Sequence, residues 1–266
     1  VNITTRKPDD EFGAFIRGQA GNSGLIGGTA GIDVPLSDTF RTKFTVSKRE
    51  RNGFTEDVLS GVDYGNIDEF AARAGAEWDI AANTMASLSI DMSENDFRPN
   101  IAESTADATA PATFQVALDA KPEAYTRSQG AALTVTHEFD NGYELTSITG
   151  LRSTTRKLTD IDEDYSAFPA ATTDFVTEDA DNISQEFRIA SPEYDRFDYV
   201  AGVYYLDQQI DGNAQASALL AALNPAFPAI YRSVTHEESL SAQSFAIFAH
   251  GNYDISEQLQ LTAGLR

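Results

Sequence analysis

The chain has 266 residues, with 41 Asp and Glu against 19 Lys and Arg, and a formal net charge of −22 at pH 7. A nucleic-acid-binding protein normally carries a basic patch, but the one basic cluster, residues 43–51, is flanked by acidic residues, which argues against nucleic acid as a partner. The chain has no cysteine, which excludes disulfides and thiolate metal sites. It has no apolar run of about 18 residues, so it contains no transmembrane helix.

Eleven segments in which apolar and polar residues alternate follow one another along the chain. Successive side chains of a strand point to opposite faces, so each segment predicts a β-strand with one apolar and one polar face. Most segments have about 9 to 15 residues, long enough to cross a bilayer as a tilted strand and longer than the usual strand of a soluble domain. The segments are 13–22, 24–34, 40–50, 69–80, 85–95, 125–139, 143–157, 182–191, 197–210, 241–255 and 258–266.

Short and long connections alternate between these segments. The short ones are 35–39, 81–84, 140–142, 192–196 and 256–257, and the long ones are 51–68, 97–124, 158–181 and 211–240. Outer-membrane barrels have short periplasmic turns and long extracellular loops. The pattern therefore predicts an all-β, antiparallel transmembrane β-barrel. Residues 214–224 (AQASALLAALN) have the pattern of a short helix, which would lie in the last long connection. A secreted β-solenoid or adhesin would show a fixed repeat period, which is absent, whereas a passive porin would share the strand pattern.

Two further sets of residues follow from the parity of the strands. Aromatic residues on the apolar parity beside short turns predict a periplasmic girdle at the membrane interface. These are Phe40, Trp78, Phe139, Tyr143, Phe197 and Tyr253. Charged residues and a histidine on the polar parity are expected to line the lumen and to contact a plug inside it. These are Arg73, Glu77, Glu138, Glu144, Arg152, Glu186, Arg188 and His250.

Several stretches resemble TonB-dependent outer-membrane receptors, in the order in which that family has them. Residues 1–8 (VNITTRKP) look like the last plug strand, and residues 33–54, 144–153, 182–192 and 244–266 look like barrel strands and their turns. The resemblance implies the Gram-negative outer membrane and a barrel of about 22 strands closed by a plug domain. It places the end of the plug at residues 1–10 and the first half of the barrel at 11–266, so further strands are expected after residue 266.

The same resemblance implies a function and a set of partners. The family takes up scarce ligands actively, most often a ferric siderophore, with energy from the inner-membrane TonB complex. Lipid, lipopolysaccharide and the plug of the same protein are the other expected partners. Motifs of hydrolases, P-loop proteins and metalloproteases are absent from the sequence, so we do not expect an enzyme.

The long connections hold the candidate ligand-binding residues. Aromatic rings there would stack on a flat ligand, or they would only pack the loops against one another. They are Phe97, Tyr125, Tyr165, Phe168, Phe175 and Tyr231.

One long connection, 158–181, is strongly acidic and has no Lys or Arg. Asp160, Asp162 and Asp164 alternate in it like oxygen ligands of Ca²⁺, although the glycine turn and closing glutamate of an EF-hand are missing. A solvated acidic loop is the alternative, and such a loop could also bridge to lipopolysaccharide through divalent cations. No other cofactor is expected.

Overall fold

The computed structural model describes residues 5–99, 101, 113–192, 196–219, 226 and 230–266. Eleven of its strands form one antiparallel sheet in which each strand pairs with the next one along the chain, as predicted. These strands are β1 (Gly13–Ala20), β2 (Ile26–Ser37), β3 (Phe40–Arg51), β6 (Ile67–Ala81), β7 (Thr84–Phe97), β9 (Glu123–Glu138), β10 (Glu144–Asp162), β11 (Ala171–Ala190), β12 (Phe197–Leu219), β13 (Tyr231–Ser256) and β14 (Leu259–Leu265).

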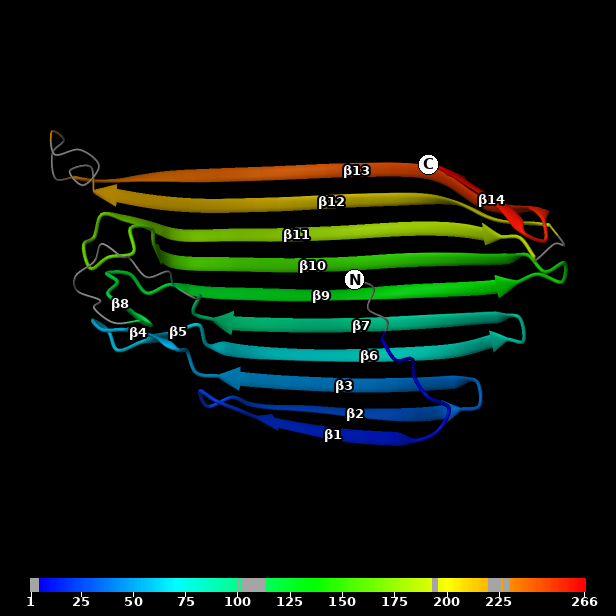
Figure 1. The fold of residues 1–266 in the computed structure, drawn as a ribbon, viewed down its shortest axis with the longest axis horizontal. Coiled ribbons are helices and arrows are strands. Elements are labelled where there is room, and N and C mark those ends of the chain that lie inside the picture. Colours follow the sequence, from blue (N-terminus) through cyan, green and yellow to red (C-terminus); the bar gives the residue numbers. More distant parts are fainter. Residues whose placement is uncertain (1–4, 100, 102–112, 193–195, 220–225, 227–229) are drawn as a thin grey trace.

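The sheet has two different ends (Figure 1). The turns after β2, β6, β9, β11 and β13 gather at one end, which we call the short-turn end, and the longer connections gather at the other, the long-loop end. The turn between β1 and β2 is the exception, because it is short but lies at the long-loop end. It needs left-handed backbone, which Ser23 (φ 57°) and Gly24 (φ 65°) provide. The sheet is open, since β1 and β14 stand at its two edges.

Several strands run further toward the long-loop end than the sequence predicts. The connection predicted at 158–181 shrinks because β10 continues to Asp162 and β11 begins at Ala171. The helix predicted at 214–224 is wrong for residues 214–219, which belong to β12, and its remainder lies outside the described residues. Alanine has the highest intrinsic helix propensity, but this preference is small and tertiary pairing overrides it. The adjacent strand offers a complete ladder instead, since Ala171 to Ala190 pair with residues 200–218 of β12.

A second, smaller sheet caps the long-loop end. Its strands are β4 (Thr55–Asp57), β5 (Asp63–Tyr64) and β8 (Gln115–Val116), in the order β5-β4-β8. Tyr64, Val116 and Leu118 form a small buried core beneath it. Figure 1 shows this sheet beside the ends of β3, β6 and β7. Two connections that are far apart in the sequence are thereby packed together.

No helix in the described part of the chain is long and apolar enough to span a membrane.

Candidate functional site: the two faces of the sheet and the long-loop end

The strand register gives the large sheet two chemically different faces. Arg73, Asp91 and Arg152 lie in one row across β6, β7, β9 and β10, because each strand places its row member opposite that of its neighbour. We call the face with this row the polar face. The opposite face, which carries Ile90 and Leu151, is the apolar face. Both of these side chains are about half exposed, at 51% and 49%.

The register places all eight residues predicted to line the lumen on the polar face. Arg152 stands opposite Gly130 in the row that contains Arg73 and Asp91, and the other six lie an even number of residues from members of this row or from their partners. These residues are Arg73, Glu77, Glu138, Glu144, Arg152, Glu186, Arg188 and His250. One parity of each strand therefore supplies one continuous charged surface.

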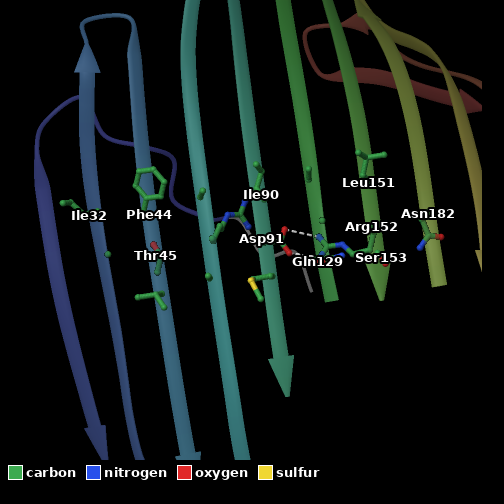
Figure 2. Close-up of a pocket in the computed structure, with 18 of the residues that line it drawn as sticks. Ile32, Phe44, Thr45, Ile90, Asp91, Gln129, Leu151, Arg152, Ser153 and Asn182 are labelled. Atoms are coloured by element: carbon green, nitrogen blue, oxygen red, sulfur yellow. Dashed lines mark hydrogen bonds and ion pairs between the residues drawn. The ribbon is translucent and has the colours of Figure 1, made fainter. Parts of the chain in front are cut away.

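A bidentate ion pair crosses the middle of the polar face. Arg152 donates from Nη1 to Asp91 Oδ2 at 2.6 Å and from Nη2 to Asp91 Oδ1 at 3.1 Å. Figure 2 shows the two side chains pointing toward one another across β9. The guanidinium passes over Gly130, where an added Cβ would lie 2.7 Å from Arg152 Cζ. Asp91 lies on the polar parity of its segment, so the alternation that singled out Arg152 also identifies its partner.

The segment that precedes β1 lies against the polar face. Lys7 Nζ is 3.7 Å from Glu77 Oε2, and the backbone N–H of Asp9 donates to Asp33 Oδ1 at 3.2 Å. Asp33 also accepts from Lys43 Nζ at 2.7 Å, and Pro8 lies over the backbone of Gly75. Figure 1 shows this segment running across β6, β3 and β2 before it enters β1. The residues predicted to end the plug are therefore seated on the charged face.

Glu77 is the most enclosed of the eight predicted residues and is 4% exposed. Its carboxylate accepts a hydrogen bond from the Ser87 hydroxyl at 2.7 Å and pairs with Lys7. An anionic group that is removed from water needs such partners, because an unpaired buried charge is costly. The pairing with Lys7 shows that Glu77 is one point where the sheet holds the preceding segment.

The apolar face is apolar over a band that begins at the short-turn end. On β13 the band includes Ile247 and Phe245, which are 62% and 68% exposed, and the next residue on that face is Gln243. On β12 it ends between Tyr205 and Asp207, which stand opposite Phe245 and Gln243. The boundary therefore lies at the same height on both strands, and polar side chains follow it toward the long-loop end.

Aromatic rings stand at the short-turn edge of this band. Phe40 stands opposite Trp78, with ring centroids 6.4 Å apart, and Phe197 stands opposite Tyr253. Phe139 and Tyr143 flank the turn between β9 and β10, and the Phe139 N–H donates to the Tyr143 carbonyl at 2.8 Å. The six rings predicted as a girdle thus gather at the short-turn end, where an interface belt would be needed.

A hollow of about 1210 Å³ crosses the sheet at mid-height from β1 to β12 (Figure 2). Residues of both parities border it, among them Phe44, Ile90 and Leu151 and the row of Arg73, Asp91 and Arg152. Its position in the middle of the sheet separates it from the long loops. None of the six aromatic residues predicted to bind a ligand lines it.

Those six aromatic residues are spread over the long-loop end. Phe97 ends β7 and Tyr125 lies in β9, but the register pairs Tyr125 with Asp96 and Phe97 with Ala124, so the two rings belong to opposite faces. Tyr165 and Phe168 lie between β10 and β11 and are 40% and 56% exposed. The other two are in strands, Phe175 in β11 and Tyr231 at the start of β13. The five rings that the structure describes, without that of Tyr231, do not form one cluster, and the role of all six as ligand contacts stays a prediction.

Carboxylates gather at the long-loop end in a different set from the predicted one. Oxygens of Asp119, Asp162 and Asp164 lie within 4.8 Å of one another. Asp160 is not in the group. Its backbone is left-handed (φ 54°), and its Oδ2 accepts the Lys121 N–H at 2.7 Å. The sequence pattern did not single out Asp119, because it lies in another connection and carries no local signal.

Burial raises the pKa of two carboxyls in this acidic group, which lies beyond the apolar band. Burial, followed by the negative charges of Asp164 and Asp119, raises the pKa of Asp162 to about 6. Burial also raises the pKa of Asp119. Two carboxyls in close contact disfavour ionisation of both. The three carboxylates are hard oxygen donors, the type that Ca²⁺ and Mg²⁺ prefer.

Comparison with known proteins matches this arrangement by structure and not by sequence. No protein-family model matches the chain, and no characterised protein matches its sequence. The structure matches the siderophore receptor PiuA of Acinetobacter baumannii with a TM-score of 0.75 and 9% identity, over 98% of this chain and 42% of that one.

Two further solved structures show the same likeness. The alcaligin outer-membrane receptor FauA of Bordetella pertussis matches with a TM-score of 0.57 and 14% identity, over 95% of this chain and 42% of that one. The ferripyoverdine receptor of the Pseudomonas aeruginosa outer membrane matches with a TM-score of 0.59 and 14% identity, over 94% and 41%. The chain thus spans well under half the length of these proteins. Its eleven-stranded antiparallel sheet has the fold of part of the barrel of outer-membrane siderophore receptors.

Proposed function

We propose that this chain forms part of a TonB-dependent outer-membrane receptor of a Gram-negative bacterium that takes up a scarce ligand of the ferric siderophore class. The observation that carries the proposal is the eleven-stranded sheet with one polar and one apolar face, which matches PiuA over 98% of the chain. All three matched proteins are receptors, two of them of the outer membrane, and one structure contains bound ferripyoverdine. The function of the whole protein rests on that likeness together with the residues described above.

In this proposal the apolar face contacts lipid. Hydrocarbon offers no hydrogen bonds to the backbone, so only helices and strands with paired neighbours can cross it. The band that ends at Phe245 and Tyr205 supplies the apolar surface, and the rings at the short-turn end supply the periplasmic interface. Polar side chains beyond the band would face the headgroups and lipopolysaccharide of the outer leaflet.

The polar face then lines the lumen and holds the plug. The contact of Lys7 with Glu77 and that of Asp9 with Asp33 support this, because they fix the segment before β1 on that face. A plug that closes the lumen distinguishes an energised receptor from a passive porin. In this proposal, coupling to TonB belongs to the plug.

Iron uptake tests the proposal directly. A strain in which the gene is deleted should lose uptake of radioactive iron from at least one of a panel of ferric siderophores, and the intact gene should restore it. The same uptake should disappear when TonB is inactivated in the complemented strain. Uptake that persists without TonB would indicate a passive porin, and uptake that never depends on the gene would reject the receptor function.

The orientation in the membrane has its own test, which uses the absence of cysteine from the chain. Leu59 is exposed at the long-loop end, and Glu257 is exposed in the short turn after β13. In the full-length protein, a Leu59→Cys variant should react with a membrane-impermeant maleimide on intact cells. A Glu257→Cys variant should react only after the outer membrane is permeabilised. The reverse pattern would reject the proposed orientation.

A further inference from the structure

One carboxylate at the long-loop end has a buried oxygen without a partner. Asp162, the last residue of β10, is 1% exposed. Its Oδ1 accepts hydrogen bonds from the N–H groups of Asp164 at 3.0 Å and Tyr165 at 2.7 Å. Its Oδ2 is buried and has no hydrogen-bond partner. Buried polar atoms are nearly always satisfied, so an exception points to a water or an ion that completes the site.

The surroundings of this oxygen are negative. Asp119 and Asp164 bring their carboxylate oxygens to within 4.8 Å of those of Asp162 and of each other. None of the ion pairs found in the described part of the chain includes any of the three. Backbone N–H groups fix the position of Asp164 instead, since its Oδ2 accepts the Ala170 N–H at 3.2 Å and the Ala171 N–H at 3.0 Å. The backbone therefore holds the carboxylates in place, but no positively charged side chain pairs with them.

The two connections that supply the carboxylates are tied together by hydrogen bonds at Asp119 and just after it. The N–H of Leu118 donates to Asp57 Oδ1 of β4 at 3.3 Å, which holds the first connection against the small sheet. The Asp119 N–H donates to the Ser166 carbonyl at 3.2 Å. Two residues later, the Lys121 N–H donates to Asp160 Oδ2 at 2.7 Å. Asp119 is thus brought to Asp162 by hydrogen bonds that do not involve the three carboxylates. The site is preorganised, which lowers the cost of binding a ligand.

We propose that Asp119, Asp162 and Asp164 bind one calcium ion, which links the connection before β9 to the connection between β10 and β11. All three donors are carboxylate oxygens, and the group holds no histidine or cysteine, so a hard cation fits better than a transition metal. Calcium accepts six to eight oxygens in irregular geometry, so nearby carbonyls and waters can complete its coordination. The ion neutralises the group and gives Asp162 Oδ2 its missing partner.

This inference does not depend on which ligand the receptor transports. Its competitor is a proton shared between Asp119 and Asp162, which would also relieve the repulsion without any metal. The two states differ in their response to added calcium at neutral pH. They also differ in which residues matter, because a shared proton needs only Asp119 and Asp162, whereas the ion also needs Asp164.

Calorimetry on the full-length protein in detergent tests the site after treatment with a chelator. At pH 7, wild-type protein should bind one more calcium ion per molecule than the Asp162→Asn and Asp119→Asn variants bind. The Asp164→Asn variant should bind at least about 10-fold more weakly than wild type. Asp160→Asn is the matched control, because it removes a negative charge beside the group while the asparagine amide oxygen can still accept the Lys121 N–H, and it should bind calcium as wild type does.

Hydrogen exchange provides a second readout, and its comparison of wild type with and without calcium does not depend on how well a variant folds. Calcium should slow exchange in residues 113–122 and 163–170 of wild type and of Asp160→Asn, while exchange in the mid-strand residues of β9 and β10 stays unchanged. It should have no such effect in Asp162→Asn. The proposal is overturned if wild type shows no more calcium binding than Asp162→Asn, or if calcium leaves exchange in both connections unchanged.

Discussion

Replacing Gly130 by alanine should break the ion pair that crosses the polar face. A Cβ at this position would lie 2.7 Å from Arg152 Cζ and 2.7 Å from the carbonyl oxygen of Leu151. The guanidinium can swing away, but the Leu151 carbonyl is backbone and belongs to the β9–β10 ladder. The substitution therefore forces the two strands apart locally as well as displacing Arg152 from Asp91.

The expected cost has two parts. The side chains of Arg152 and Asp91 are 43% and 27% exposed, so solvent screens the pair and its loss should cost no more than about 1 kcal/mol. Overpacking against fixed backbone costs about 1–3 kcal/mol. Alanine also restricts the unfolded chain, which returns about 0.4–1 kcal/mol. The net destabilisation should be about 2 kcal/mol.

Urea unfolding of the full-length protein in detergent, followed by circular dichroism, measures this cost. Gly75→Ala is the matched control, because Gly75 lies on the same face of an interior strand and its Cβ would meet Pro8 at 3.7 Å and the Leu88 carbonyl oxygen at 3.9 Å, both ordinary contacts. The control should be unchanged or slightly stabilised. Combining Gly130→Ala with Arg152→Ala should cost about 1 kcal/mol less than the sum of the single changes. The reasoning is refuted if Gly130→Ala and Gly75→Ala unfold at the same urea concentration.

Three further outcomes follow from the structure. Glu77→Ala and Lys7→Ala should each speed hydrogen exchange in residues 5–12, because each removes the same ion pair; unchanged exchange in both variants would show that this pair does not hold the segment. Trp78 is the one tryptophan of this chain, so the difference in fluorescence between wild type and Trp78→Phe reports on this residue. Lipids brominated near the headgroup should quench this fluorescence more than lipids brominated at the chain end do. Equal quenching would contradict an interfacial position. Burial raises the pKa of Tyr64 to about 12, so its stabilising effect is fully present below pH about 10 and is lost as the pH rises through about 12. The phenolate absorbance lost in Tyr64→Phe should therefore titrate near 12, and titration near 10 would show that the loop core is open.

The number, order and faces of the long strands could be predicted from the sequence. Alternation is a local property, because each residue of a strand turns its side chain to the face opposite that of its neighbours. Counting parity in single segments was therefore enough to assign Glu77, Arg152 and Arg188 to one face, and the register agrees. The short turns could be predicted for the same reason, since their residues interrupt the alternation.

The ends of the strands at the long-loop end could not be predicted in this way. Residues 214–219 have a composition that suits a helix, and their strand conformation depends on β11 and β13 on either side. The acidic group shows the same limit. Asp160, Asp162 and Asp164 are neighbours in sequence, but the left-handed backbone at Asp160 turns its carboxylate to another partner.

The sequence by itself determined that this protein is a row of long antiparallel strands with one charged and one apolar face, because that information repeats within every strand. Only the tertiary structure decided which distant residues meet. Glu56 pairs with Gln115 in the small sheet, Lys7 reaches Glu77, and Asp119 joins Asp162. Each of these contacts joins residues that are distant in the sequence. The packing of the whole sheet determines which residues meet, and the neighbours of each residue in the sequence do not.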